Sequence, residues 1–198
     1  NRLIQLQQTR DRPIPHRLGN VLLPFFKKWP IEALNAVYTT DKTKKIIEIL
    51  TNRFDRHGDT VISVVPENTL LEWCEISPKD RYVFAAQTCK IFEKPNPGQG
   101  SEEAVIGISN AARNLLVRAP DKKKVLEVLV SRFYPKSWSG SLAAIIRQRT
   151  AFVDQLNPLG DAEINQLLEE VKTRFSVAIK YEEEHEQDQE RSRTASFE

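Results

Sequence analysis

The chain has 198 residues, of which 40% are hydrophobic and 28% are charged, and its formal net charge at pH 7 is +2. This composition is typical of a folded globular protein and excludes a chain that is disordered throughout. No apolar run approaches the roughly 18 residues of a membrane span and no signal-peptide pattern occurs, so we expect no membrane partner. The seven glycines are few, which favours helices with short connections over a β-sandwich.

The charge is distributed unevenly along the chain. Residues 1–60 hold eleven Lys and Arg against six Asp and Glu, a net +5. Residues 161–198 hold five against eleven, a net −6. This polarity either guides assembly with a partner or reflects solvated helix faces.

The two cysteines indicate a redox setting, and the first residue bears on whether the sequence is a whole protein. Cys74 and Cys89 lie within helical patterns and lack metal-ligand spacing, so we expect two buried, reduced thiols in a cytoplasmic protein. The sequence begins at Asn1 and contains no methionine. We therefore expect an excised fragment or a processed product of something longer.

A near repeat predicts the architecture. The segments KKIIEILTNRF (44–54) and KKVLEVLVSRF (123–133) share Lys-Lys, Glu, Leu, Arg and Phe at the same places. They begin 79 positions apart, about twice the ~40–47 residues of a HEAT or armadillo unit. We therefore predict an all-α fold, a HEAT/armadillo-like α-solenoid of antiparallel helix pairs with a long C-terminal helix.

In the first half, helices are expected over 15–29, 31–38 and 44–54, the last with Asp41 as its N-cap and a stop at 57–59. The first of them is interrupted by Pro24, and its apolar stripe is Leu18, Leu22, Phe25, Phe26 and Trp29. Residues 61–65 fit either a kinked helix, which we favour, or a strand. ENTLLEWCEI and the segment opening at Ser77-Pro78 predict two more helices.

The Pro- and Gly-rich residues 94–100 predict a linker between helical repeats over 1–93 and over 101–181. Helices are then expected from a Ser101 cap, from Pro120-Asp121, from Ser137 to Leu156, and from Asp161. The charged tail, 182–198, can continue only as a solvated helix or as disorder.

The sequence lacks the usual catalytic and metal-binding patterns. Neither common phosphate-binding glycine loop occurs, and the three histidines have no i, i+4 partner suited to zinc. Ser139-Gly140-Ser141 has a faint likeness to a nucleophile elbow, but that motif follows a strand and the flanks here are helical. We predict no enzymatic activity, no cofactor and no metal.

Lysines in the two repeats are the first group of candidate partner-binding residues. Stacked repeats would align these lysines in a stripe that could follow a phosphate backbone, although lysines beside a core usually extend into water. These candidates are Lys44, Lys45, Lys122, Lys123 and Lys124.

The segment from Tyr134 to Ser141 supplies the second group. In the structural interpretation, which we favour, Pro135 stops one helix, Ser137 caps the next, Trp138 folds back against the preceding pair and Gly140 allows close helix contact. In the functional interpretation, a ligand-contact patch lies at a helix start, where amide groups favour anions. These candidates are Lys136, Trp138, Arg147 and Arg149.

Three features, ISNAARNLLVRAPDKKKVLE, PKSWSGSLAAII and the charged tail ending in Phe197-Glu198, carry a resemblance to a known group of proteins. Through them, residues 108–198 resemble the C-terminal helical-repeat region of some large bacterial signalling or phage-defence proteins; LLEWCEISPKDR in the first half is of the same kind. The resemblance implies a sensing or scaffolding segment served by an upstream effector or NTPase domain.

We therefore predict a non-enzymatic interaction module: a sensor, scaffold or oligomerisation arm of a larger bacterial, phage-defence protein. Its expected partner is a protein or an upstream domain of the same polypeptide. The alternative is a nucleic-acid-binding module that uses the basic clusters.

Overall fold

The computed structural model describes residues 18–40, 44–51, 60–95, 104–136 and 138–195. They are mostly helical, which confirms the predicted all-α class. In chain order the elements are α2 (Leu18–Lys28), α3 (Pro30–Thr40), α4 (Lys44–Thr51), the 3-10 helix η1 (Val61–Val64), α5 (Glu67–Ile76), α6 (Pro78–Thr88), β1 (Phe92–Glu93), β2 (Gly107–Ile108), α7 (Asn110–Arg118), α8 (Lys122–Ser131), α9 (Leu142–Thr150), the 3-10 helix η2 (Val153–Leu156) and α10 (Ala162–Ala195).

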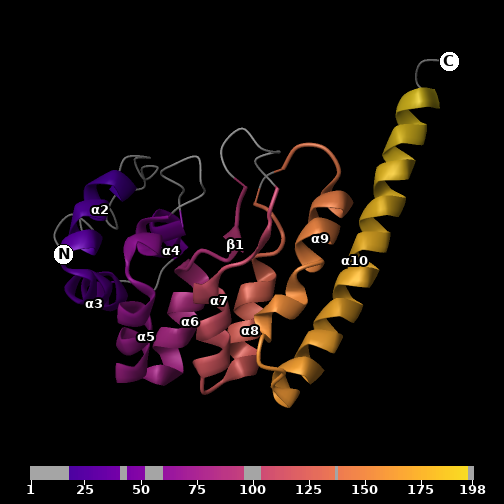
Figure 1. The fold of residues 1–198 in the computed structure, drawn as a ribbon. Helices are drawn as coiled ribbons and strands as arrows, with labels where there is room; N and C mark the ends of the chain where they lie inside the picture. Colours follow the sequence, from indigo (N-terminus) through magenta and orange to yellow (C-terminus); the bar gives the residue numbers. More distant parts are fainter. Residues whose placement is uncertain (1–17, 41–43, 52–59, 96–103, 137, 196–198) are drawn as a thin grey trace.

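The helices lie side by side in a row that runs from α2 and α3 at one end to α10 at the other (Figure 1). In the middle of the row, α5 packs on α6 and α7 packs on α8. These two hairpins also pack on each other, α5 against α7 and α6 against both α7 and α8. A helical-repeat fold requires contacts of this kind between neighbouring helix pairs, but they do not by themselves show one. A HEAT-like superhelix over the whole chain stays a prediction.

One hydrophobic core passes through both predicted halves of the chain, from Phe26 in α2 to Phe175 in α10. The repeated segments contribute to it equivalently: Leu50 in α4 and Leu129 in α8 are fully buried, and both helices pack against α6. The charged tail continues the last helix, so that α10 is 34 residues long and its C-terminal turns extend beyond the other helices (Figure 1). No helix in the described ranges combines the length and the apolar character needed to cross a membrane.

Three arginines connect successive elements by capping helix C-termini. The Arg81 guanidinium donates from α6 to the carbonyl of Trp73 in α5 at 2.9 Å. Arg132, which follows α8, donates to the carbonyls of Ala86 and Cys89 at the end of α6, at 2.6 and 2.7 Å. The last carbonyls of a helix have no partner within the helix, and positive charge is favourable there.

Arg149 is the third of these arginines and the most enclosed. It donates from α9 to the carbonyl of Phe133, just after α8, at 2.7 Å. Its guanidinium also lies 5.3 Å from the centre of the Phe92 ring. Only 5% of the residue is exposed, so the charge is held inside the fold by these contacts.

The chain around the predicted linker differs from expectation. The helix expected from a Ser101 cap is wrong, because the described chain is extended before α7 begins at Asn110, where the Ser109 hydroxyl accepts from the amide of Ala112 at 3.1 Å. Strands β1 and β2 pair antiparallel, with Phe92 opposite Ile108. β-branched residues around Gly107 favour this extended backbone. The linker residues 96–100 lie outside the described ranges.

The backbone amide of Ile108 donates to the side-chain oxygen of Gln155, in η2, at 2.9 Å. A Cβ atom at Gly107 would lie 2.9 Å from that same oxygen, so glycine permits this close approach. The strand therefore holds the start of α7 against η2.

The start of α9 also differs from expectation. The helix begins at Leu142, because the cap is the Ser141 hydroxyl, which accepts from the amide of Ala144 at 3.0 Å, and not Ser137. Gly140 has φ of +77°, and a Cβ atom there would meet nothing within 4 Å among the described residues beyond its chain neighbours. It therefore provides a left-handed turn and not a close helix contact. Half of the Trp138 side chain is exposed, so it does not fold fully against the preceding pair.

In the first half, residues 61–64 are helical, as favoured, and not a strand; they form a short 3-10 helix that ends before Pro66, where the separate helix α5 follows. The predicted Asp41 cap and the stop at 57–59 lie outside the described residues. The predicted starts at Asp121 and Asp161 are confirmed, since both carboxylates accept amide hydrogens of the following turn.

Candidate interaction surfaces

The lysines of the predicted stripe differ in their surroundings: one of them forms ion pairs within the fold and two are exposed. Lys122 Nζ lies 2.7 Å from an Asp161 carboxylate oxygen and 3.3 Å from one of Glu163. The hydrogen bond between Lys122 and Asp161 raises the pKa of the lysine and lowers the pKa of the aspartate. Lys123 and Lys124 are exposed. The backbone of Lys44 and Lys45 opens α4, and their side chains lie outside the described part of the structure.

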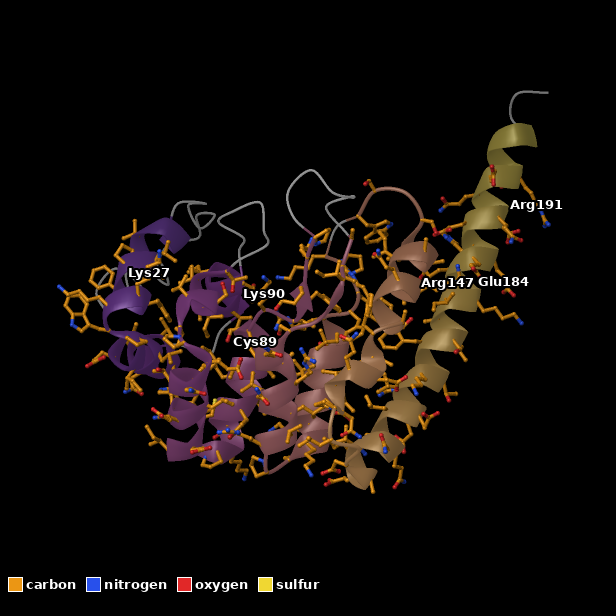
Figure 2. All side chains as sticks on the ribbon, viewed as in Figure 1. Lys27, Cys89, Lys90, Arg147, Glu184 and Arg191 are labelled. Atoms are coloured by element: carbon orange, nitrogen blue, oxygen red, sulfur yellow. The ribbon has the colours of Figure 1, made fainter. Side chains whose placement is uncertain are left out.

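The predicted patch at the start of α9 is also divided. Arg147 points from α9 toward α10 (Figure 2). It forms an ion pair with Glu183 of α10. Arg149 is the buried arginine that caps α8. Lys136 and Trp138 remain exposed in the segment between α8 and α9. The two arginines therefore serve contacts within the fold, whereas Lys136 and Trp138 stay available at the surface.

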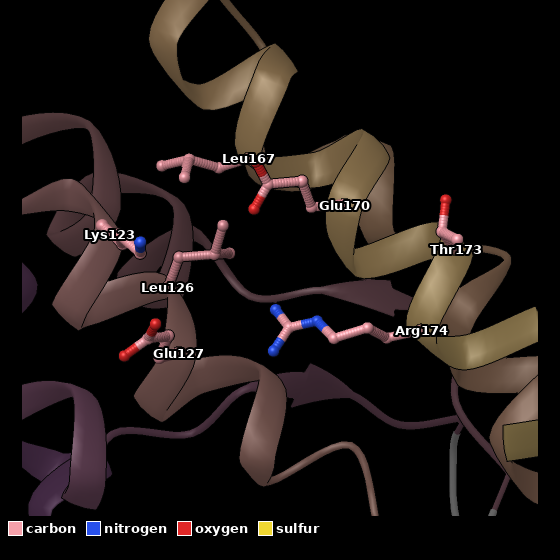
Figure 3. Close-up of a pocket in the computed structure, with 7 residues that line it drawn as sticks. All are labelled: Lys123, Leu126, Glu127, Leu167, Glu170, Thr173 and Arg174. Atoms are coloured by element: carbon pink, nitrogen blue, oxygen red, sulfur yellow. The ribbon is translucent and has the colours of Figure 1, made fainter. Parts of the chain in front are cut away.

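A groove of about 460 Å³ lies between α8 and α10. Leu126 is buried beneath it and Leu167 is partly buried, while charged side chains from both helices surround them (Figure 3). The Arg174 side chain extends from α10 toward Glu127 on α8 (Figure 3). The groove therefore combines an apolar base with charges of both signs. It is lined by Lys123, Leu126, Glu127, Leu167, Glu170, Thr173 and Arg174.

The outward side of α10 carries exposed apolar residues. Val177 and Tyr181 are 67% and 65% exposed and stand one turn apart. At about 100° per residue, Glu184 and Asp188 fall on the same side of the helix, opposite the buried Phe175. We call Val177, Tyr181, Glu184 and Asp188 the α10 face.

The outward side of α2, at the other end of the row, is similar in kind. Val21 and Phe25 of α2 and Trp29, which directly follows the helix, recur every four residues and are each about half exposed. The rings of Phe25 and Trp29 are 6.2 Å apart, and Lys28 Nζ lies 4.5 Å from the Trp29 ring centre. We call Val21, Phe25 and Trp29, with the exposed Lys28, the α2 face; Lys27 is exposed too, but two residues from Phe25 it lies on the opposite side of the helix.

The α2 face corrects the predicted apolar stripe of this helix. The stripe places Phe25 and Trp29 on the inward side, but Phe26 is the aromatic residue that enters the core. The helix has large apolar residues on two sides, so periodicity could not choose between them. Sequence reasoning also missed the α10 face, although the four-residue spacing of Val177 and Tyr181 was a signal for it.

The two cysteine thiols are buried and are not poised as nucleophiles. Burial raises the pKa of the Cys74 thiol to about 12, and it raises the pKa of the fully enclosed Cys89 thiol as well. Both thiols are therefore protonated and unreactive at neutral pH, as expected for core cysteines. No set of three or more His, Cys, Asp or Glu residues that could hold a metal occurs in the described ranges.

No protein-family model, curated protein or solved structure matches the chain.

Proposed function

We propose that this chain is a non-enzymatic protein-interaction module, acting as a sensor, scaffold or oligomerisation arm of a larger protein. The observation that carries the proposal is the exposure of large apolar side chains at both ends of the helix row, on the α2 face and the α10 face. The end helices of a packed array normally present polar residues to water. Grouped apolar residues with charged neighbours are typical of protein–protein contact sites.

The likeness of residues 108–198 to C-terminal regions of bacterial signalling and phage-defence proteins supports a more specific role. In that role, the partner is a protein or an upstream domain of the same polypeptide, and the module couples this partner to an effector. The groove between α8 and α10 and the exposed Trp138 offer further contact area.

Nucleic-acid binding remains the alternative, and no specific observation favours it. A phosphate-binding stripe needs lysines that are free to neutralise phosphates. Lys122 instead contacts two carboxylates, and the last helix adds acidic residues nearby. Lys123 and Lys124 would have to carry the binding.

The test is site-specific photocrosslinking in the native host, with the crosslinking residue placed at Phe25, at Tyr181 or, as a control, at the exposed Lys79 of α6. We expect protein adducts at the first two positions and few at Lys79. Nucleic-acid adducts would favour the alternative. Absence of adducts at Phe25 and Tyr181 would remove the basis for an interaction module.

A further inference from the structure

We propose that copies of this chain associate end to end, with the α2 face of one copy packed against the α10 face of the next. This inference rests on the proposed function and names the partner for the two faces. The association is heterologous, since two different surfaces of the chain meet. It is argued from the position, the apolar content and the charge of the two faces.

The two faces lie at opposite ends of the molecule. Lys27 marks the α2 end of the row and Glu184 marks the α10 end (Figure 2). Neither face takes part in the core: the core residues of these helices include Phe26, about 100° round α2 from Phe25, and Phe175, on the opposite side of α10. A second copy can therefore meet one face without disturbing the contacts that hold each copy together.

The apolar parts of the two faces are alike in length and chemistry. Phe25 and Trp29 present two aromatic rings one turn apart, and Val177 and Tyr181 present one aliphatic and one aromatic side chain one turn apart. Two helices that each carry apolar residues at four-residue spacing can pack side by side with these residues between them. Exposed Tyr and Trp are the residue types most often responsible for binding energy at such contacts.

The charges beside the two apolar stripes are complementary. Lys28 lies beside the α2 face, over the Trp29 ring, whereas Glu184 and Asp188 continue the α10 face. Glu184 and Asp188 also have loose partners on their own helix, Lys180 at 3.9 Å and Arg191 at 3.7 Å. Exposed pairs of this length contribute little, so exchanging one of them for Lys28 of another copy costs little.

This arrangement makes a specific prediction for mixtures of variants. Contacts between unlike surfaces do not close at two copies, so the wild-type chain should form assemblies that grow with concentration. Trp29→Glu disables the α2 face and Tyr181→Lys disables the α10 face. Each variant alone should be monomeric, with self-association weakened at least about 30-fold. Mixed together, they retain one intact face of each kind and should form a one-to-one dimer and nothing larger.

The experiment is sedimentation velocity on the 198-residue chain over a wide concentration range, at low and at high salt, with circular dichroism to verify that each variant is folded. Salt is expected to weaken the wild-type assembly because the exposed charges are screened. Matched controls are Lys79→Glu on α6 and Gln187→Lys on α10, which change charge away from both faces and should behave as wild type.

Three results would overturn the inference: a wild-type chain that is monomeric throughout, a single variant that still self-associates, or a mixture that stays monomeric. Binding of a monomeric wild-type chain to anionic vesicles, lost in Trp29→Glu, would also overturn it by assigning the α2 face to a lipid surface. If the chain is monomeric in sedimentation and Phe25 or Tyr181 crosslinks to a different protein, the proposal of an interaction module stands. The proposal of self-assembly is then rejected.

Discussion

At the scale of single residues, arginine side chains decide how the helix ends are satisfied. Arg81, Arg132 and Arg149 each reach from one element to carbonyls at or just after the C-terminus of another. A guanidinium presents several donors in a fixed plane, so Arg132 can meet two carbonyls at once. Each contact joins different elements of the fold.

Replacing Arg132 by Ala is therefore expected to lower the free energy of unfolding by about 2–3 kcal/mol, because two carbonyls lose charged donors. The measurement is urea unfolding followed by circular dichroism. Arg118→Ala is the matched control: Arg118 contacts Glu75 at 3.4 Å but is half exposed, so a change within about 0.5 kcal/mol is expected. Equal effects of the two substitutions would contradict a capping role for Arg132.

At the scale of elements, α10 consists of two parts held in different ways. Its first part buries Ile164, Leu168, Val171 and Phe175 in the core. Its second part is held to α9 by polar contacts: Glu183 pairs with Arg147, and the Glu186 carboxylate accepts from the amide of Ala143 at 3.2 Å. Glu186 thereby caps the start of α9 from another helix. Polar surface contacts are weaker than core packing, so this second part is the less stable one.

Glu186→Gln should accelerate amide hydrogen exchange in residues 183–195 while changing the free energy of global unfolding by less than about 1 kcal/mol. The reason is that the amide side chain binds backbone donors more weakly than a carboxylate does. Exchange measured by mass spectrometry tests this, with the exposed Glu184→Gln as control. Equal exchange in the two variants would show that Glu186 does not hold the helix.

The same carboxylate gives a pH dependence. Burial alone would raise the pKa of Glu186, but hydrogen bonds from Ser141 and from the amides of Ala143 and Leu142 outweigh it and lower the pKa. Because its folded-state pKa is lowered, Glu186 contributes fully to the stability of the folded state above the ordinary glutamate pKa. It is lost as the pH falls through the lower folded-state value. The contact between α9 and α10 should therefore persist through mildly acidic pH.

At the scale of the whole molecule, the core is continuous across the predicted linker. Residues of both halves belong to one set of packed side chains, and α6 of the first half contacts both α7 and α8 of the second. A shared core of this kind favours unfolding of the two halves in a single cooperative transition.

Leu129→Ala, in the second half, is expected to lower the free energy of unfolding by about 2–5 kcal/mol. The free energy of unfolding reported from the first half should fall by the same amount. Trp73, fully buried in the first half, is the reporter, in a background where the exposed Trp29 and Trp138 are replaced by Phe. Its fluorescence midpoint in urea should coincide with the circular dichroism midpoint. A fluorescence midpoint unmoved by Leu129→Ala would instead indicate two independent domains.

Local signals in the sequence are enough to predict most of the helices and their starts. Asp121 and Asp161 cap as predicted, because a cap acts on amides only a few residues away. The buried cysteines and the apolar stripe of α10 also follow from periodicity, which reports on neighbours one turn apart.

Three features depend on tertiary packing. It selects which of the two apolar sides of α2 enters the core, it encloses Arg149, and it pairs residues 107–108 with residues 92–93. The physical reason is the same in each case. These outcomes depend on packing and hydrogen bonds between residues distant in the chain, and local spacing does not encode such partners. The faces proposed for assembly are therefore defined by what the core leaves uncovered.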